Sequence, residues 1–327
     1  MTTIVLLRPD KAGDLIKTLP VLRALNKIKP KLVLHLIVSK ANESLLKYEN
    51  YLTYSVLPTE WEQFDDNKLQ EVLTTLLPYP SFEVAINLLS DSFPSVERLL
   101  NLVSAQEKFS IFSDSLPIGI WPITYKNKTP IHQNETLNIA EIIGLALGLD
   151  LFQTALESPR APHLGPEDEK EALNFLKTKS GPWIGVCPFA GTLQRTHPLS
   201  HWEPLIKQLC YSADFEKVIL FGAPTALSQM DTLKQQLGSP SKLILCSPSS
   251  FRSLGAYLKR CDRVISVDSG PLHFSLALEI PSLGFLSGGD HLRWFSQISP
   301  RDKLVKRGLF SRYPSSFEMK WHFFRWK

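Results

Sequence analysis

The sequence has little cysteine and no cysteine pattern that indicates a disulfide framework or a metal site. Its four cysteines are Cys187, Cys210, Cys246 and Cys261, with irregular spacing and no C-x-x-C pair. We therefore expect buried, reduced thiols in a cytoplasmic protein. His197 and His201 lie four residues apart, but the Glu of an H-E-x-x-H zinc motif is missing, so no metal site is predicted.

Long apolar runs and a strong net charge are also missing. No stretch reaches the roughly 18 apolar residues that a membrane-spanning helix needs, and the N-terminal residues turn polar too early for a signal peptide. The 327 residues include 36 basic and 32 acidic side chains, which gives a formal net charge of +4. Because this excess is mild, no nucleic-acid partner is expected.

The first predicted turn lacks the glycine motifs of common nucleotide-binding enzymes. Residues 4–7 form an apolar strand, and the loop after them contains neither G-x-G-x-x-G nor G-x-x-x-x-G-K-[ST]. The sequence therefore argues against a nicotinamide-dependent dehydrogenase. The loop leads instead to Gly13-Asp14, where apolar residues at helical spacing begin.

Strand and helix patterns alternate on both sides of a break rich in Pro, Gly and charge at 157–169. The spacing predicts strands at 4–7, 32–38, 84–89, 183–187, 217–221, 243–246 and 263–267, and helices at 14–27, 135–149, 167–178, 201–211, 228–237 and 250–260. Such alternation predicts an α/β fold with parallel, doubly wound sheets. We expect two Rossmann-like domains, 1–160 and 161–309, facing a central cleft.

A phosphate site is predicted where the strand at 263–267 runs into "DSGPLH". Gly270 permits a tight turn, Pro271 suits the first helical position, and Asp268 or Ser269 can cap the helix. The free amides of Gly270, Leu272 and His273, with the positive end of the helix dipole, would then bind an anion. The alternative is a well-capped helix that binds no ligand.

Two further loops offer groups for the same chemistry. The loop "CPFAGTLQRTHPLSHW" follows the strand at 183–187, and in it Gly191, Thr192 and Arg195 offer donors and a fixed cation to phosphate. Near the N-terminus, Asp14 faces the positive end of a helix and could act as a general base towards a hydroxyl, with Lys11 beside it. A plain helix cap is the alternative for Asp14.

Three stretches resemble glycosyltransferase family 9, the ADP-heptose:lipopolysaccharide heptosyltransferase family. They are "RPDKAGDLIKTLPVLRAL", "PFAGTLQRTHPLSHW" and "VISVDSGPLHFSLALEIPSLGFLSG", in the order that the family has them. The resemblance implies the GT-B fold, with an acceptor domain first and a nucleotide-sugar domain second. It implies an inverting, metal-independent transfer to a lipid-linked oligosaccharide acceptor, with no cofactor besides the donor.

The resemblance also implies roles for particular residues. Asp14 would be the general base, with Gly13 and Lys11 next to the substrate. Gly191, Thr192, Arg195, Asp268, Ser269, Gly270 and His273 would line the diphosphate and the nearby sugar. The loop "FGAPTALSQ" lacks the Glu with which many members contact the ribose, so ADP, UDP and GDP all stay open as donors. A nucleotide-sugar epimerase and a non-catalytic GT-B-like nucleotide-binding protein are the alternative functions.

The C-terminal residues "KWHFFRWK", 320–327, interleave aromatic and basic side chains. This pattern suits an anionic membrane surface, such as the inner face of a bacterial inner membrane. The other expectation is that the tail, 310–327, packs its aromatic side chains back on the N-terminal domain.

Overall fold

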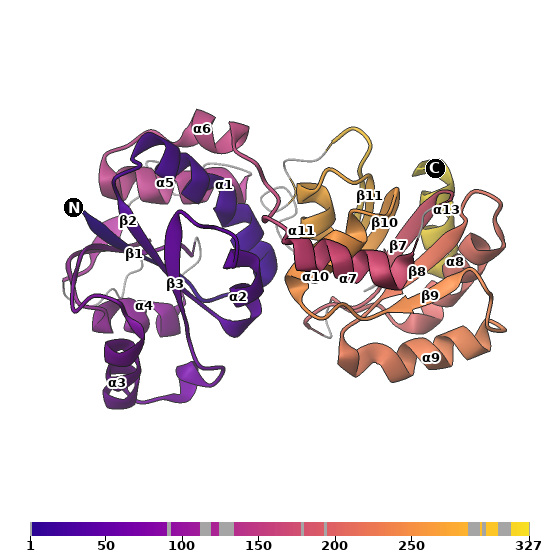
Figure 1. The fold of residues 1–327 in the computed structure, drawn as a ribbon, viewed down its shortest axis with the longest axis horizontal. Coiled ribbons are helices and arrows are strands. Elements are labelled where there is room, and N and C mark those ends of the chain that lie inside the picture. Colours follow the sequence, from indigo (N-terminus) through magenta and orange to yellow (C-terminus); the bar gives the residue numbers. More distant parts are fainter. Residues whose placement is uncertain are drawn as a thin grey trace. The chain divides into compact units, whose positions relative to one another are not determined.

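The computed structural model describes residues 2–89, 93–111, 119–123, 134–177, 180–192, 195–286, 295, 299–306 and 315–326. The chain forms two compact units, and Figure 1 shows that each is built around its own sheet. The first unit comprises Met1–His163 with Leu292–Ser296, and the second comprises Leu164–His291 with Gln297–Lys327. Among the helices that the structure describes, none has both the length and the apolar character needed to cross a membrane.

The first unit contains a parallel sheet with the strand order β3-β2-β1-β4-β5-β6 in its described part. The strands are β1 (Thr3–Arg8), β2 (Val33–Val38), β3 (Leu52–Val56), β4 (Phe82–Asn87), β5 (Ala105–Ile111) and β6 (Trp121–Ile123). The helices are α1 (Ala12–Ile28), α2 (Lys40–Leu46), α3 (Asp66–Leu76), α4 (Pro94–Leu102), α5 (Glu135–Leu147) and α6 (Phe152–Glu157). This order is the Rossmann arrangement, in which ligands bind at the carboxyl ends of the strands.

Helices cover both faces of this sheet. Helices α1, α5 and α6 contact one another on one face, and α3 and α4 lie on the opposite face (Figure 1). Strand β1 is consequently apolar from Ile4 to Leu7, and all four side chains are buried. A continuous apolar run is typical of a central parallel strand, because both of its faces are covered.

The second unit repeats this architecture with the strand order β12-β11-β10-β7-β8-β9 in its described part. The strands are β7 (Trp183–Cys187), β8 (Lys217–Phe221), β9 (Leu243–Cys246), β10 (Arg263–Val267), β11 (Ser282–Leu286) and β12 (Lys303–Lys306). The helices are α7 (Pro166–Leu176), α8 (Leu199–Tyr211), α9 (Leu227–Gln236), α10 (Phe251–Leu258), α11 (Gly270–Ala277) and α13 (Ser316–Trp326). All four cysteines are free and buried, as the sequence predicted.

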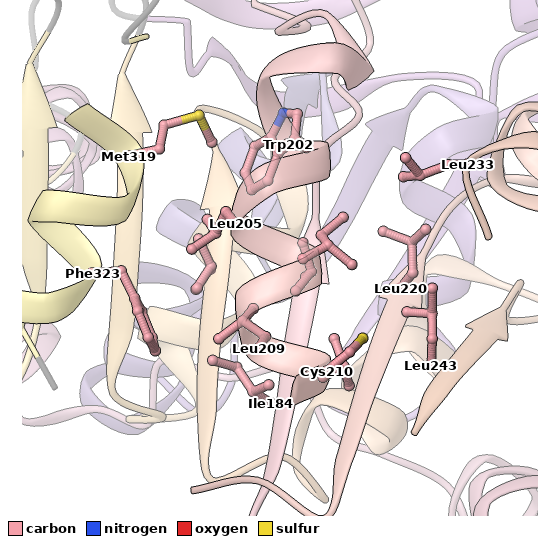
Figure 2. Packing of buried hydrophobic residues seen from close by; sticks show 14 of the residues in the cluster. Ile184, Trp202, Leu205, Leu209, Cys210, Leu220, Leu233, Leu243, Met319 and Phe323 are labelled. Atoms are coloured by element: carbon pink, nitrogen blue, oxygen red, sulfur yellow. The ribbon is translucent and has the colours of Figure 1, made fainter. Parts of the chain in front are cut away.

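The C-terminal helix α13 packs on the second unit. Met319 and Phe323 are 0% and 2% exposed and belong to the same apolar cluster as Trp202, Leu205 and Leu209 of α8. Figure 2 shows both side chains turned towards α8. The expectation that the tail packs on the N-terminal domain is therefore wrong for the described residues 315–326. The apolar face of α13 is used by the core of its own unit.

Two adjacent phenylalanines test this packing. Phe323→Ala should lower the free energy of unfolding by about 3–5 kcal/mol, because a buried ring is lost and a cavity is left. Phe324→Ala is the matched control, since Phe324 is 73% exposed, and should change stability by less than about 0.5 kcal/mol. Urea unfolding followed by circular dichroism measures both. Equal losses for the two variants would contradict the packing of α13.

Candidate functional site

In the first unit, the loop between β1 and α1 is held in place by α2. The buried Asn42 donates its side-chain amide to the carbonyl of Arg8 at 3.2 Å and to that of Asp10 at 3.1 Å. The hydroxyl of Ser39, just before α2, donates to the Asp10 carbonyl at 2.8 Å. These bonds fix the backbone from which the side chains of Asp10 and Asp14 project.

Asp14 is the third residue of α1, because the helix begins at Ala12, two residues earlier than the apolar spacing predicted. Its carboxylate accepts the backbone N–H of Lys11 at 3.3 Å, so it satisfies one of the unpaired amides at the helix start. The side chain is partly buried, Gly13 is buried and Lys11 is exposed. Lys11 is the N-cap residue of α1, so Asp14 supports the helix start from the third helical position and is not itself the N-cap.

A buried cation lies under this loop, and the sequence had not singled it out. Arg8 is 1% exposed and donates from Nη1 to the Leu88 carbonyl at 2.7 Å. Its Nε lies 3.2 Å from Oδ1 of Asp10, and its Nη2 lies 3.8 Å from Oε1 of Glu135. Glu135, the first residue of α5, has a fully buried side chain. The guanidinium therefore joins the ends of β1, β4 and α5.

Burial changes the acidity of this charge cluster. It raises the pKa of Asp14 above its ordinary value of 3.8, the positive charge of Arg8 opposes the rise, and the negative charge of Glu135 adds to it. Burial likewise raises the pKa of Asp10, again opposed by Arg8. Burial lowers the pKa of Lys17, one turn along α1, to about 8. A carboxylate with a raised pKa is a stronger base, so Asp14 is suited to accept a proton.

In the second unit, the loop between β10 and α11 adopts the predicted strand–turn–helix form. The hydroxyl of Ser269, the N-cap residue of α11, donates to the Val267 carbonyl at 3.2 Å and makes no side-chain cap bond to the helix. Gly270 is required because a Cβ there would lie 2.7 Å from the Phe251 ring. Phe251 in turn stacks on Phe274 at a centroid distance of 5.6 Å.

The predicted set of free amides at this helix start needs correction. The N–H groups of Leu272 and His273 both donate to the Ser269 carbonyl, at 3.0 and 3.3 Å. They are bonded because Ser269 is the first residue whose carbonyl closes a helical turn. Of the predicted anion-binding features, the Gly270 amide and the positive end of the helix dipole remain candidates. His273 is 7% exposed.

The loop after β7 lies beside the β10–α11 turn. Nη1 of Arg195 is 3.8 Å from Oδ1 of Asp268, and Nε of Arg195 donates to the Thr192 hydroxyl at 3.3 Å. The Thr196 hydroxyl donates to the Ala190 carbonyl at 3.2 Å and closes the loop on itself. The two stretches that the sequence singled out therefore supply a cation, a hydroxyl and a carboxylate to one place.

A cavity of about 540 Å³ opens at the carboxyl edge of this second sheet. Its walls come from the segments that follow β7, β8 and β9, with one residue of α11. They are Cys187, Phe189, Ala190, Gly191, Phe221, Gly222, Ala223, Pro224, Thr225, Pro248, Ser249, Ser250, Phe251, Leu254 and Pro271. The size is that of a small-molecule site, and the lining is mostly apolar with a few hydroxyls.

Several of these groups were missed at the sequence level. Arg8 and Asp10 lie in the first quoted stretch but were given no role there, and only the fold brings the distant Glu135 to them. The wall from Pro248 to Phe251 carried a usable signal, a Pro-Ser-Ser-Phe segment that begins two residues after the end of a strand. Among the described residues, no group of three or more His, Cys, Asp or Glu side chains is arranged to hold a metal ion.

Two Rossmann-like units, the second with a cavity of small-molecule size at the carboxyl edge of its sheet, are the architecture of the GT-B class of proteins. The model of glycosyltransferase family 9 (heptosyltransferase) matches residues 128–312, more than half of the chain. The chain therefore belongs to this family, as the three sequence stretches indicated. It is an enzyme of glycosyl transfer, and the epimerase and non-catalytic alternatives are not favoured.

Individual relatives agree with this assignment. The chain is 23% identical over 288 residues to lipopolysaccharide heptosyltransferase 3 of Escherichia coli K12, covering 86% of this chain and 81% of the relative. A family 9 glycosyltransferase of Veillonella parvula superposes with a TM-score of 0.75 at 16% identity, covering 98% and 91% of the two chains. The E. coli heptosyltransferase WaaC with ADP gives 0.71 at 15% identity, covering 99% and 97%.

Proposed function

We propose that this enzyme transfers a heptose, or a related sugar, from an ADP-linked donor to a lipopolysaccharide core acceptor on the cytoplasmic side of a membrane. Support comes from the family and from the curated relative, which is named for lipopolysaccharide heptose transfer. The observation on which the proposal depends is the Asp14 carboxylate, fixed at the start of α1 with a pKa raised by burial.

The reaction is a single displacement with inversion at the anomeric carbon. The acceptor hydroxyl oxygen forms a bond to that carbon, while the bond from the carbon to the diphosphate oxygen breaks. The hydroxyl proton passes to Asp14, and the bonding electron pair leaves with the nucleoside diphosphate. Gly13 and Lys11 flank the base, and the exposed ammonium of Lys11 attracts an anionic acceptor.

The departing diphosphate gains negative charge in the transition state, and residues of the second unit stabilise it. Arg195 provides the cation, since its pair with Asp268 at 3.8 Å is long and leaves the guanidinium able to turn to a phosphate. Thr192 and His273 provide side-chain donors, Gly191 and Gly270 provide backbone amides, and Ser269 holds the turn through its bond to the Val267 carbonyl. Asp268 holds Arg195 in the loop before the donor binds. No metal ion or cofactor is assigned to this step.

The cavity of the second unit would take the nucleoside part of the donor. The rings of Phe189 and Phe251 offer apolar surface to a base, and Thr225 and Ser249 offer hydroxyls to the ribose. The described residues that line this cavity include no carboxylate, so their chemistry does not by itself select one nucleobase. The ADP assignment is supported by the family and not by the cavity.

The Asp14→Asn variant tests the general base. It removes the proton acceptor with little change of shape, so kcat should fall by about 10²–10⁴-fold, while the Kd for ADP stays within about twofold because ADP binds the second unit. Turnover of ADP-heptose with a lipopolysaccharide core acceptor gives kcat, and calorimetry gives Kd. Asp231→Asn, an exposed position on α9, is the control. A near-normal rate for Asp14→Asn would remove the assignment.

Two single variants, Arg195→Ala and His273→Ala, test the diphosphate site. Each should weaken ADP binding by about tenfold or more, because a hydrogen bond to a charged group contributes about 1.5–3 kcal/mol. Lys207→Ala, an exposed position on α8, should leave the affinity unchanged. Thermal shifts with ADP, UDP, GDP and CDP rank the nucleotides on the unmodified enzyme. If both variants bound ADP normally, the donor would bind elsewhere.

A further inference from the structure

Helix α13 exposes a row of large aromatic side chains. Phe317, Trp321 and Phe324 are 76%, 45% and 73% exposed. They occupy positions i, i+4 and i+7 and therefore share one helix face. Met319 and Phe323, on the opposite face, are buried in the core of the second unit. The core does not use the exposed row, although exposing three such rings in one row is unusual for a monomeric protein.

Basic side chains lie around this row. Lys320 and Arg325 are exposed on α13, and the Arg325 guanidinium lies 4.9 Å from the centre of the Trp321 ring. From the neighbouring strand β12, the Lys303 ammonium lies 5.9 Å from the same ring. The one acidic residue of α13, Glu318, accepts the backbone N–H of Ser315 at 2.6 Å and so belongs to the helix cap.

We propose that Phe317, Lys320, Trp321, Phe324 and Arg325, the α13 surface, bind an anionic lipid membrane. Aromatic rings insert at the boundary between headgroups and acyl chains, and cations beside them pair with anionic headgroups. The positive charge of the α13 surface favours an anionic membrane over a second copy of the chain as its partner. Two copies joined through this surface would bring Lys320 and Arg325 of each close to the same cations of the other, and like charges repel.

The α13 surface is formed before it meets a membrane. Many amphipathic helices order only on binding, and the ordering entropy then weakens their affinity. Here Met319 and Phe323 fix α13 on α8, and the indole of Trp326 donates to the Arg301 carbonyl at 2.8 Å. The rings of the row are presented on a rigid element, so binding does not have to fold the helix. This inference does not depend on the reaction proposed above.

Vesicle co-sedimentation tests the proposal with the full-length protein. Phosphatidylcholine vesicles containing phosphatidylglycerol should bind it, and the binding should weaken as salt is added. The Lys320→Gln/Arg325→Gln variant should bind about thirtyfold more weakly, since each basic side chain near an anionic surface contributes about 1 kcal/mol. The Phe317→Ser/Trp321→Ser/Phe324→Ser variant should lose about a hundredfold or more, because its apolar area is gone.

Control variants distinguish binding through the α13 surface from nonspecific adsorption to vesicles and from effects on the active site. Trp121→Ser and Lys170→Gln change an exposed aromatic and an exposed cation outside α13, and should bind vesicles as the unmodified protein does. All variants should keep their affinity for ADP, which also shows that they fold. The proposal is wrong if the aromatic variant still binds, if pure phosphatidylcholine binds equally well, or if light scattering shows a dimer that the aromatic substitutions dissociate.

Discussion

The buried guanidinium of Arg8 organises the part of the first unit that carries Asp14. A charge at 1% exposure is costly unless partners compensate it. The Leu88 carbonyl, Asp10 and Glu135 surround it, and they belong to three different parts of the fold. The same positive charge acts on the pKa of Asp14. One interaction thus links the ends of two strands and a helix to the ionisation of the proposed base.

The topology of the two sheets explains why the candidate functional residues lie in the loops that follow the strands. Parallel strands end at a common edge, so the segments after β7, β8, β9 and β10 come together although they are far apart in sequence. In the second unit, Gly270 lets the Phe251 ring approach the start of α11, and that ring also lines the cavity. The start of α11, where we propose that the diphosphate binds, and the apolar cavity therefore share the Phe251 ring.

The sequence predicted the regular parts of the fold well. The bounds of β7, β8, β9 and β10 agree with their apolar runs, because buried parallel strands need such runs. The proximity of Arg195 and Asp268 followed from two loops at one sheet edge. The Arg8 cluster could not be predicted, because Glu135 lies more than a hundred residues away and reads as an ordinary first-turn carboxylate. The C-terminal tail was expected on the wrong unit, because the spacing of its aromatic residues indicates which helix face is buried but not which part of the protein that face packs on.

The link between Arg8 and Asp14 is tested most directly by the pH dependence of kcat/KM. A carboxylate base must be ionised, so activity is present above its pKa and is lost as the pH falls through it. Removing the nearby positive charge should raise that pKa, so Arg8→Gln should move the acid limb to higher pH by about one unit or more. Arg98→Gln, a partly exposed arginine of the same unit, should leave the limb in place. An unchanged acid limb in folded Arg8→Gln would contradict the account.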